Sequence, residues 1–408
     1  MKIALLHYSS PPIVGGVESV LANHARLMAK AGHEVTILAG RGETFDANIP
    51  VRVLPLLDSR QSEVMAIKGA LDGGKYTSAF DALRDEIKAE LLAELQGFDI
   101  LIAHNVASLH KNLPLTAALH DIYKISGFPK LVLWHHDLAC TAPRYRQEMH
   151  DGYPWNLLCT NWRDVTQVVI SELRRQELSH LLGLPPESIR VIPNGVDVNA
   201  FYKLEPQTTQ LVEQLCLLDA DPLFLLPVRL TPRKNIELAL HILTELRNQF
   251  PKATLLVTGP EGPHNPANAA YRLRLLALRN KLKLQGAVHF LADVTDAVIP
   301  DAVIADFYRL ADALLFPSLE EGFGIPLIEA AFSSIPVFCS DIPVLRELCG
   351  EDVTYFDPDS EPHSIADMII ERLQSEASSR WARRAKHNFS WNSIYTYLIE
   401  PLIQEVGK

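Results

Sequence analysis

The sequence lacks the segments that attach proteins to membranes or to nucleic acids. No apolar stretch among its 408 residues reaches the ~20 residues that span a bilayer. The opening MKIALLHYSS has neither the long apolar run nor the cleavage site of a signal peptide. A net charge of −11 argues against tracking of a phosphate backbone. We therefore expect a cytoplasmic protein with no transmembrane segment and no nucleic-acid partner, and peripheral contact with the inner membrane face stays open.

The sequence has few cysteines, and their spacing shows no paired motif. The five cysteines form an odd set without a CxxC pair: Cys140, Cys159, Cys216, Cys339 and Cys349. In a reducing compartment such residues are most simply small apolar side chains. A zinc site built from His135, His136, Cys140 and Cys159 is a second interpretation. It is disfavoured because the spacing matches no standard ligand pattern.

Low-complexity tracts are also missing, and the composition is that of a folded chain, 48% hydrophobic and 21% charged. Its length favours two domains, since one core rarely serves so many residues. Short apolar runs alternate with amphipathic stretches, which is typical of parallel sheets covered on both faces. We predict an α/β protein with two doubly wound, Rossmann-like domains. Their strands are expected at 3–6, 34–38, 100–103, 131–134, 168–170 and 190–192, and at 223–228, 254–258, 288–291, 313–316, 337–339 and 353–356.

A turn-forming run marks the domain boundary. Pro, Asn and Gly stand together in Pro193-Asn194-Gly195-Val196-Asp197, where they break both helical and strand periodicity. We therefore assign 1–195 to the first domain and 196–388 to the second. A helical stretch rich in Tyr, Leu and Ile, at about 389–408, follows the second sheet and is expected to return to the first domain.

The most informative segment is FPSLEEGFGIPLIEAAF at 316–332. It joins a predicted strand to a predicted helix, which is where doubly wound domains bind ligands. Gly322 and Gly324 permit close approach of a ligand to the backbone, and the helix N-terminus attracts phosphate. Glu329 stands one turn inside the helix and Glu321 before it, so both could bind ligand hydroxyls. The alternative is a glycine-rich loop that caps a helix, with both glutamates in solvent.

A basic segment ends the first strand of the second domain. In Val228-Arg229-Leu230-Thr231-Pro232-Arg233-Lys234-Asn235, Arg229 and Lys234 are expected at the same sheet edge as Glu321. An arginine and a lysine stabilise the charge that grows on a leaving diphosphate when no metal does so. A solvated loop, the alternative, explains Arg233 better than it explains the other two.

Two adjacent glycines follow the first strand. Gly15 and Gly16 open a predicted helix and form a second potential anion cradle. The glycine pattern G-x-G-x-x-G is missing from residues 8–20, which weakens the interpretation as an NAD-dependent dehydrogenase.

Six blocks in this order resemble the family-4 retaining glycosyltransferases of the GT-B fold. They are GGVE at 15–18, HD at 136–137, IPNGVD at 192–197, VRLTPRKN at 228–235, EGFGIPLIE at 321–329 and FSW at 389–391. The block at 321–329 is the most specific, because it reproduces the E-x7-E pattern of the family. The resemblance covers nearly the whole chain and implies two Rossmann-like domains with a deep cleft between them.

The resemblance also implies roles for residues of the second domain. Arg229 and Lys234 are similar to the family's diphosphate clamp. Glu329 is similar to its ribose ligand. Glu321 would lie near the hydroxyls of the donor sugar, and three neighbours would offer backbone contacts to the donor: Gly322, Phe323 and Gly324. The segment that ends at Val294 would cradle the base.

In the first domain, Gly16 is similar to the family's glycine on the phosphate and acceptor side. His136 would face the transferred sugar and act with Glu321, Arg229 and Lys234 in catalysis. The alternative is a histidine that caps the end of a strand. The resemblance favours front-face attack without a covalent nucleophile, although two carboxylates invite the covalent mechanism.

The implied activity is metal-independent transfer of a hexose, with retention, from a nucleotide-sugar donor to a carbohydrate or lipid-linked sugar acceptor. UDP-glucose is the first choice of donor and GDP-mannose the second, on family frequency alone. Synthesis of envelope polysaccharide or exopolysaccharide is the expected context. The remoter alternatives are a GT-B-shaped epimerase or phosphorylase and a non-catalytic sugar-binding protein.

Two segments need separate interpretation. Residues 138–164 depart from the commonest family pattern and are rich in aromatic side chains. Tyr145, Arg146 and Trp155 are candidates for an acceptor-binding or lid segment, the alternative being a loop that closes its own small core. Asp357-Pro358-Asp359 is a DxD triplet in a predicted turn, and we expect no metal there and no cofactor.

Overall fold

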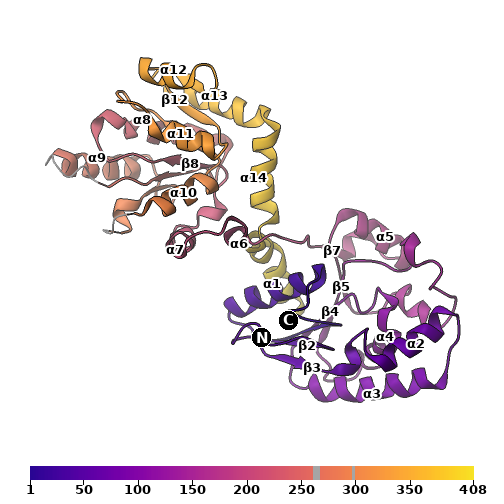
Figure 1. The fold of residues 1–408 in the computed structure, drawn as a ribbon. Helices are drawn as coiled ribbons and strands as arrows, with labels where there is room; N and C mark the ends of the chain where they lie inside the picture. The colour runs from indigo at the N-terminus through magenta and orange to yellow at the C-terminus, as the bar shows by residue number, and fades with distance from the viewer. Residues whose placement is uncertain (261–266, 296–298) are drawn as a thin grey trace. The chain divides into compact units, whose positions relative to one another are not determined.

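The computed structural model describes residues 1–260, 267–295 and 299–408. The chain divides into two compact units, each built around its own sheet (Figure 1). Unit 1 comprises Met1–Gly195 and Trp391–Lys408, and unit 2 comprises Val196–Ser390. Over the described residues, no helix is both long enough and apolar enough to cross a bilayer.

The sheet of unit 1 has seven strands in the order β3-β2-β1-β4-β5-β6-β7. Every pair of neighbours is parallel, and β1 pairs with β2 on one side and β4 on the other. Helices cover both faces, so the inner strands are apolar along their length, as the all-buried β4 illustrates. The strands are β1 (Lys2–His7), β2 (Glu34–Ala39), β3 (Val51–Val53), β4 (Ile100–His104), β5 (Lys130–His135), β6 (Thr166–Val169) and β7 (Ile189–Val191).

Helices and single turns connect these strands. Their ends follow local chemistry, since Gln61, Asn112 and Ser171 accept backbone N–H bonds as N-caps. The α-helices are α1 (Gly16–Lys30), α2 (Ser62–Asp72), α3 (Ser78–Glu94), α4 (Leu113–Ile122) and α5 (Glu172–Leu182). The short 3₁₀ turns are η1 (Pro55–Leu57), η2 (His110–Asn112), η3 (Pro143–Tyr145), η4 (Trp155–Leu158) and η5 (Pro186–Ser188).

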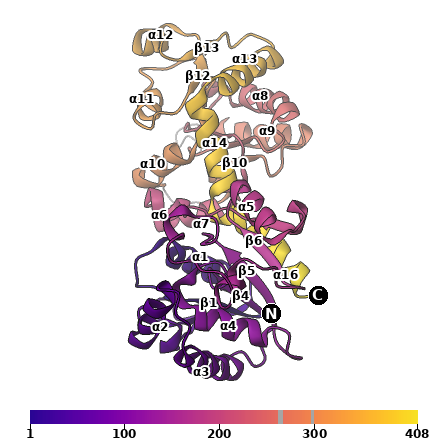
Figure 2. The same cartoon turned by 90° about the vertical axis from the view of Figure 1, so that its right-hand side faces the viewer.

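The C-terminal segment completes unit 1. It consists of α15 (Trp391–Ile394), the π-helical turn η9 (Tyr395–Ile399) and α16 (Glu400–Val406). Trp391 and Ile394 are buried in the same apolar cluster as Ile3 of β1. Figure 2 shows this yellow segment beside the indigo strands of the N-terminus. The first unit is therefore closed by residues that follow the second in sequence.

The sheet of unit 2 has six parallel strands in the order β10-β9-β8-β11-β12-β13. Its core joins the strands to the helices on both faces, and Phe224, Leu256 and Phe316 are fully buried within it. The strands are β8 (Leu223–Leu226), β9 (Thr254–Val257), β10 (Val288–Phe290), β11 (Ala313–Phe316), β12 (Val337–Ser340) and β13 (Thr354–Phe356).

Nine α-helices are described in unit 2. They are α6 (Val198–Tyr202), α7 (Pro206–Gln214), α8 (Ile236–Gln249), α9 (Ala267–Lys281), α10 (Asp301–Leu310), α11 (Ile325–Phe332), α12 (Pro343–Cys349), α13 (Pro362–Ser375) and α14 (Ala377–Phe389). The 3₁₀ turns are η6 (Leu217–Asp219), η7 (Pro232–Lys234) and η8 (Leu291–Asp293).

In each sheet the chain first adds strands on one side of the first strand and then adds the rest on its other side. The order changes between β1 and β4 in unit 1, and between β8 and β11 in unit 2. In doubly wound sheets, the loops that leave such a pair of strands diverge to opposite faces and leave a crevice for ligands. The two pairs of loops are therefore where functional side chains are expected.

The sequence prediction of two doubly wound domains is confirmed, and each predicted strand exists within about two residues of its expected bounds. The structure adds β3, which the sequence did not predict. Val51–Val53 has only three residues and is mostly exposed at the edge of the sheet. A strand that short has too little alternation to be recognised by its pattern.

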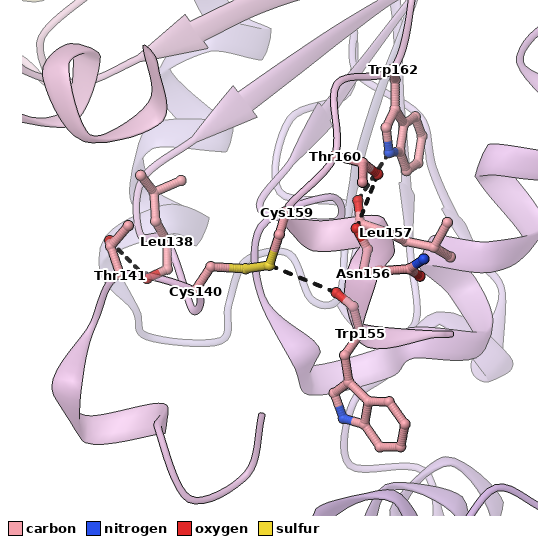
Figure 3. The surroundings of a disulfide bond; sticks show 9 residues. All are labelled: Leu138, Cys140, Thr141, Trp155, Asn156, Leu157, Cys159, Thr160 and Trp162. Atoms are coloured by element: carbon pink, nitrogen blue, oxygen red, sulfur yellow. Dashed lines mark hydrogen bonds between the residues drawn. A yellow bond between two sulfur atoms is a disulfide. The ribbon is translucent and has the colours of Figure 1, made fainter. Parts of the chain in front are cut away.

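The prediction that the five cysteines are simply small apolar side chains is wrong for two of them. Cys140 and Cys159 form a disulfide, with their Cα atoms 6.3 Å apart (Figure 3). Cys216, Cys339 and Cys349 are free. The alternative zinc site fails for the same reason, because neither bonded sulfur is a thiolate ligand. The fold of the loop between them, rather than their spacing, brings the two cysteines together.

Candidate functional site

The two loops at the reversal point of unit 2 meet through an ion pair. Lys234 ends η7, which follows β8, and Glu321 belongs to the loop that follows β11. The Lys234 ammonium donates a hydrogen bond to Glu321 Oε1. Its Nζ also lies 5.4 Å from the ring centroid of Phe316, within cation–π range. The prediction that Lys234 and Glu321 share one sheet edge is confirmed.

This ion pair is largely withdrawn from water. The side chains of Lys234 and Glu321 are 10% and 8% exposed. Burial is the main cause and lowers the pKa of Lys234; Glu321 opposes it, and the charge of Arg233 adds a smaller lowering. The net direction is downward, so the ammonium is held in a place where its charge is costly. An anion at this point would be attracted by a cation that has little water around it.

Arg229 stands at the same edge but in a different state. Its side chain is exposed, and within the described part of the chain its guanidinium has no hydrogen-bond or ion-pair partner. The backbone beneath it is tightly fixed, since a Cβ on Gly259 would lie 2.1 Å from the Val228 carbonyl oxygen. Arg233 differs, because its Nη1 donates to the Glu320 carbonyl at 3.2 Å. Arg229 is thus the cation left available to a ligand.

The glycine-rich loop enters α11 as the sequence predicts. Gly324 is the N-cap with φ of 102°, in the left-handed region, and a Cβ there would lie 2.8 Å from Leu345. A Cβ on Gly322 would meet open space. Phe323 is exposed. Pro326 occupies the second helical position, because the helix begins at Ile325.

Glu329 is held by a residue that the sequence analysis did not identify. Tyr308 of α10 donates its hydroxyl to Glu329 Oε2 at 2.7 Å. Tyr308 is 2% exposed. Ser318 was also missed, and its fully buried hydroxyl has no hydrogen-bond partner in the described structure. A tyrosine in a core-facing helix and a serine in a loop carry no sequence signal that separates them from ordinary packing residues.

Val294, predicted to cradle the base, follows η8 at the end of β10 and is half buried against the core of unit 2. The order β10-β9-β8-β11 puts two strands between β10 and β11. Unit 2 therefore brings together Lys234 and Glu321 directly, with Glu329 one turn into α11. Val294 stands further along the same carboxyl edge.

In unit 1, Gly15 and Gly16 open α1 as predicted. Gly15 is the N-cap and Gly16 the first helical residue. A Cβ on Gly16 would meet nothing within 4 Å, whereas one on Gly15 would meet the Glu18 carboxylate. Glu18 Oε1 in turn accepts a hydrogen bond from Ser9 at 2.6 Å. Gly16 is thus the open position at this helix end.

His136 lies just after β5 within a cluster of buried histidines. Its Nε2 is 3.1 Å from His104 Nδ1, and its backbone N–H donates to Asn105 Oδ1 at 2.7 Å. Burial, with smaller contributions from the neighbouring His24 and His7, lowers the pKa of His136 to about 3. The imidazole is therefore neutral at physiological pH. It resembles a strand-capping histidine in its contacts, while its position at the carboxyl edge is the one predicted for a sugar-facing residue.

The aromatic segment 138–164 is closed by the disulfide and packs into unit 1. Trp155 is 4% exposed and belongs to the core cluster, and Figure 3 shows it beside the disulfide. Of the two roles predicted for Trp155, this burial contradicts acceptor binding, because a buried ring has no face to offer a sugar; the lid interpretation stays a prediction. Tyr145 is partly buried against His110, with ring centroids 5.0 Å apart. Arg146 is exposed.

One group in the described chain has metal-ligating side chains close together, namely Asp72, His110 and Glu148. The Lys68 ammonium already lies 2.5 Å from Asp72 and 3.1 Å from Glu148. Because the Lys68 ammonium pairs with both carboxylates, the three residues form part of an ion-pair network. In the DxD triplet, Asp357 Oδ1 accepts the backbone N–H of Asp359 at 2.9 Å, as in an Asx turn.

A pocket of about 370 Å³ lies elsewhere in unit 2. Its lining includes Pro336, Val337 and Thr354, where β12 and β13 begin. It therefore opens at the amino ends of the strands. Lys234 and Glu321 stand at the carboxyl ends, so this pocket is separate from the candidate site.

Comparison with known families fits this geometry. The sequence model described as "Glycosyl transferases group 1" matches residues 209–388, and the model described as "Glycosyltransferase Family 4" matches residues 14–200. Together they cover most of both units. The chain belongs to the family-4 glycosyltransferases. The resemblance predicted from the six sequence blocks is thereby confirmed, and the protein is an enzyme of glycosyl transfer.

Several proteins named as glycosyl-transferring or sugar-synthesising enzymes are similar in sequence. An MMP alpha-(1->4)-mannosyltransferase of Mycolicibacterium hassiacum is 26% identical, covering 97% of this chain and 96% of that protein. A mannosylglucosylglycerate synthase of Petrotoga mobilis is 27% identical over 63% of this chain, and the match spans 62% of the relative's length. The O-antigen chain mannosyltransferase B of Escherichia coli is 25% identical, over 68% of this chain and 71% of that protein.

Among solved structures, a glycosyltransferase from Rickettsia africae aligns over 100% of this chain and 98% of its own. The identity is 18% and the TM-score 0.38.

Proposed function

We propose that the protein transfers a hexose, with retention and without a metal ion, from a nucleotide diphosphate sugar to a carbohydrate or lipid-linked sugar acceptor. The observation that carries this proposal is the buried Lys234–Glu321 pair at the reversal point of unit 2. It puts a cation of low hydration and a carboxylate where the loops of a doubly wound sheet bind ligands.

The cations account for departure of the diphosphate. As the bond between the sugar C1 and the phosphate oxygen breaks, negative charge grows on that oxygen. Lys234 already stands in a poorly hydrated place, so its charge is felt strongly there. Arg229 is exposed at the same edge and can form bidentate contacts with phosphate oxygens.

The carboxylates account for orientation of the donor. Glu329 is assigned to the ribose hydroxyls and Glu321 to hydroxyls of the sugar, as the family resemblance implies. In the proposed front-face reaction, the acceptor oxygen bonds to C1 on the face from which the diphosphate leaves. The acceptor's hydroxyl proton passes to the leaving phosphate oxygen, so no enzyme carboxylate forms a covalent bond to the sugar.

Mannose is the donor sugar that the relatives favour, because the similar proteins of M. hassiacum and E. coli are named as mannosyltransferases. Glucose from UDP-glucose, the first expectation from family frequency, stays the second candidate. Envelope or other polysaccharide synthesis is the proposed context, since an O-antigen enzyme is among the relatives.

A donor panel tests this proposal. The purified protein is incubated with GDP-mannose, UDP-glucose and their base-exchanged counterparts, with and without α-mannoside and glucoside acceptors, and release of GDP and UDP is measured. We expect one donor to be consumed fastest and to yield an α-linked product by NMR. Lys234→Ala should abolish most of the release, whereas Lys283→Ala, an exposed lysine of the same unit, should not. Absence of both turnover and binding with every nucleotide sugar would refute the proposal.

A further inference from the structure

We propose that Tyr308 is a positioning residue that orients the Glu329 carboxylate for the ribose of the donor, and so sets the preference for ribonucleotides over deoxyribonucleotides. The inference rests on the proposed function, which assigns Glu329 to the ribose hydroxyls. Its physical basis is a buried phenol that reaches from one helix to a carboxylate on the next.

The contact is specific in its geometry. Tyr308 comes from α10 and is 2% exposed, and its hydroxyl lies 2.7 Å from Glu329 Oε2 and 3.2 Å from the Pro326 carbonyl oxygen. A phenol has one proton to donate. The shorter contact to an ionised acceptor is the stronger one, so the proton is directed at Glu329.

The phenol remains a donor over the working pH range. Burial raises the pKa of Tyr308, and the hydrogen bond to Glu329 and its negative charge raise it further. Because Tyr308 stays protonated, its hydroxyl donates a hydrogen bond to Glu329 and stabilises the ionised carboxylate, which is the form that accepts hydrogen bonds. The carboxylate is thereby prepared to accept further hydrogen bonds from a ligand.

The contact with Tyr308 also leaves the second carboxylate oxygen of Glu329, Oε1, available to a ligand. A carboxylate has about four lone-pair positions, and Tyr308 occupies one of them on Oε2. Oε1 has no hydrogen-bond partner within the described residues, and Glu329 as a whole is half buried. With one oxygen fixed, the second is held in a defined direction, where vicinal ribose hydroxyls can donate to it.

A purely structural role is the competing explanation, because the same hydrogen bond also joins α10 to α11. The two roles differ in what they predict for binding. A structural tie would affect all ligands equally. A positioning contact affects only ligands whose hydroxyls meet Glu329, and its effect disappears when Glu329 is removed.

The test measures binding to the full-length protein by calorimetry. The ligands are UDP and GDP with their 2′-deoxy and 3′-deoxy forms. The variants are Tyr308→Phe, Glu329→Ala and the double variant. Tyr395→Phe is the matched control, since Tyr395 is a buried tyrosine that donates to a helical carboxylate, Glu400, in unit 1.

We expect Tyr308→Phe to weaken binding of the preferred ribonucleotide about five- to tenfold, the effect of ordering one free side chain on binding. Binding of the form that lacks the contacted hydroxyl should change less than twofold. Adding Tyr308→Phe to Glu329→Ala should cause no further loss, and Tyr395→Phe should leave the ratio of ribo to deoxy affinity unchanged. Circular dichroism confirms that each variant is folded.

An equal loss for ribo and deoxy ligands, or a full additional loss in the Glu329→Ala background, would overturn the positioning role. So would unchanged binding by Tyr308→Phe. If the wild-type protein bound no nucleotide at all, the proposed function would fail, and the inference with it.

Discussion

At the residue scale, Lys234 shows why position in the fold matters more than charge alone. Most of the lysines are free to be solvated at the surface, but this one is 8% exposed and faces Glu321. A buried cation with one carboxylate partner has given up hydration that a phosphate could replace. For this reason Lys234 is the residue to which we assign stabilisation of the departing diphosphate in the proposed reaction.

Lys234→Ala is expected to lower kcat by about 10²- to 10³-fold, the usual effect of removing a charge-stabilising donor. KM for the donor should change much less, because the charge it offsets grows in the transition state. Steady-state kinetics with the preferred donor checks this. Thermal melting is the necessary control, since the buried Glu321 would keep only its longer contact with Arg233, at 3.9 Å. A change in KM alone would contradict the assigned role.

Lys234 should also impose an alkaline limit on turnover. Burial lowers its pKa below the ordinary lysine value, so rising pH removes its proton earlier than it would from a surface lysine. If the charged form is required, kcat falls on the alkaline side at a pH below 10.5. Lys234→Arg keeps the charge at every such pH and should remove that decline. An identical alkaline limb in both proteins would assign it to another group.

At the element scale, the strands and the loops that follow them were predictable from the sequence, whereas side-chain contacts between separate segments were not. Apolar runs such as Leu223–Leu226 predict buried strands, because helices cover both faces of a parallel sheet. Their order, and with it the reversal beside β8, places Lys234 near Glu321. No periodicity relates Tyr308 to Glu329 or Cys140 to Cys159, because those contacts depend on how separate elements pack.

The disulfide-closed loop is an element with a measurable contribution to stability. The two cysteines are separated by 19 residues, and closing a loop of this size contributes about 3 kcal/mol by restricting the unfolded chain. Replacing both cysteines by serine should lower the melting temperature of unit 1 by roughly 6–12 °C. Differential scanning calorimetry of the two proteins checks this. Replacing the free, exposed Cys216 by serine is the control and should have little effect.

The histidine cluster predicts an acid-sensitive unit 1. Burial lowers the pKa of His24 and His136 to about 3 and that of His7 to about 4. These groups bind protons more readily when unfolded, so their neutral forms stabilise the fold above pH 6.5. This contribution is lost as pH falls toward 4. At pH 5, each histidine has lowered the free energy of unfolding by about 2 kcal/mol relative to its value above pH 6.5.

We therefore expect the transition of unit 1 to shift to lower temperature between pH 7 and pH 5. His24 is the informative residue, because it is fully buried and neither ring nitrogen has a partner in the described structure. His24→Leu should reduce the pH-dependent shift without removing a hydrogen bond. His241→Leu, which changes an exposed histidine of unit 2, should not. Melting curves that do not depend on pH over this interval would refute the linkage.

At the scale of the whole molecule, the distribution of charge bears on the proposal that the reaction needs no metal. The chain carries a net charge of −11, yet the reversal point of unit 2 presents Lys234 and Arg229. The two acidic groups that resemble metal sites make other interactions. Lys68 forms ion pairs with Asp72 and Glu148, and Asp357 accepts the backbone N–H of Asp359. Under the proposed function, Lys234 and Arg229 would neutralise the diphosphate in place of a bound ion.

Activity should therefore persist in excess EDTA, within about twofold of the untreated rate, because Lys234 and Arg229 supply the positive charge that a metal would otherwise provide. Initial rates with the preferred donor, after dialysis against chelator, measure this. Asp357→Asn combined with Asp359→Asn should leave the rate unchanged, because these carboxylates contribute a turn rather than ligands. Loss of activity in EDTA with recovery on adding Mg²⁺ or Mn²⁺ would show instead that the leaving group is stabilised by a metal, and would transfer the role proposed for Lys234 to that ion.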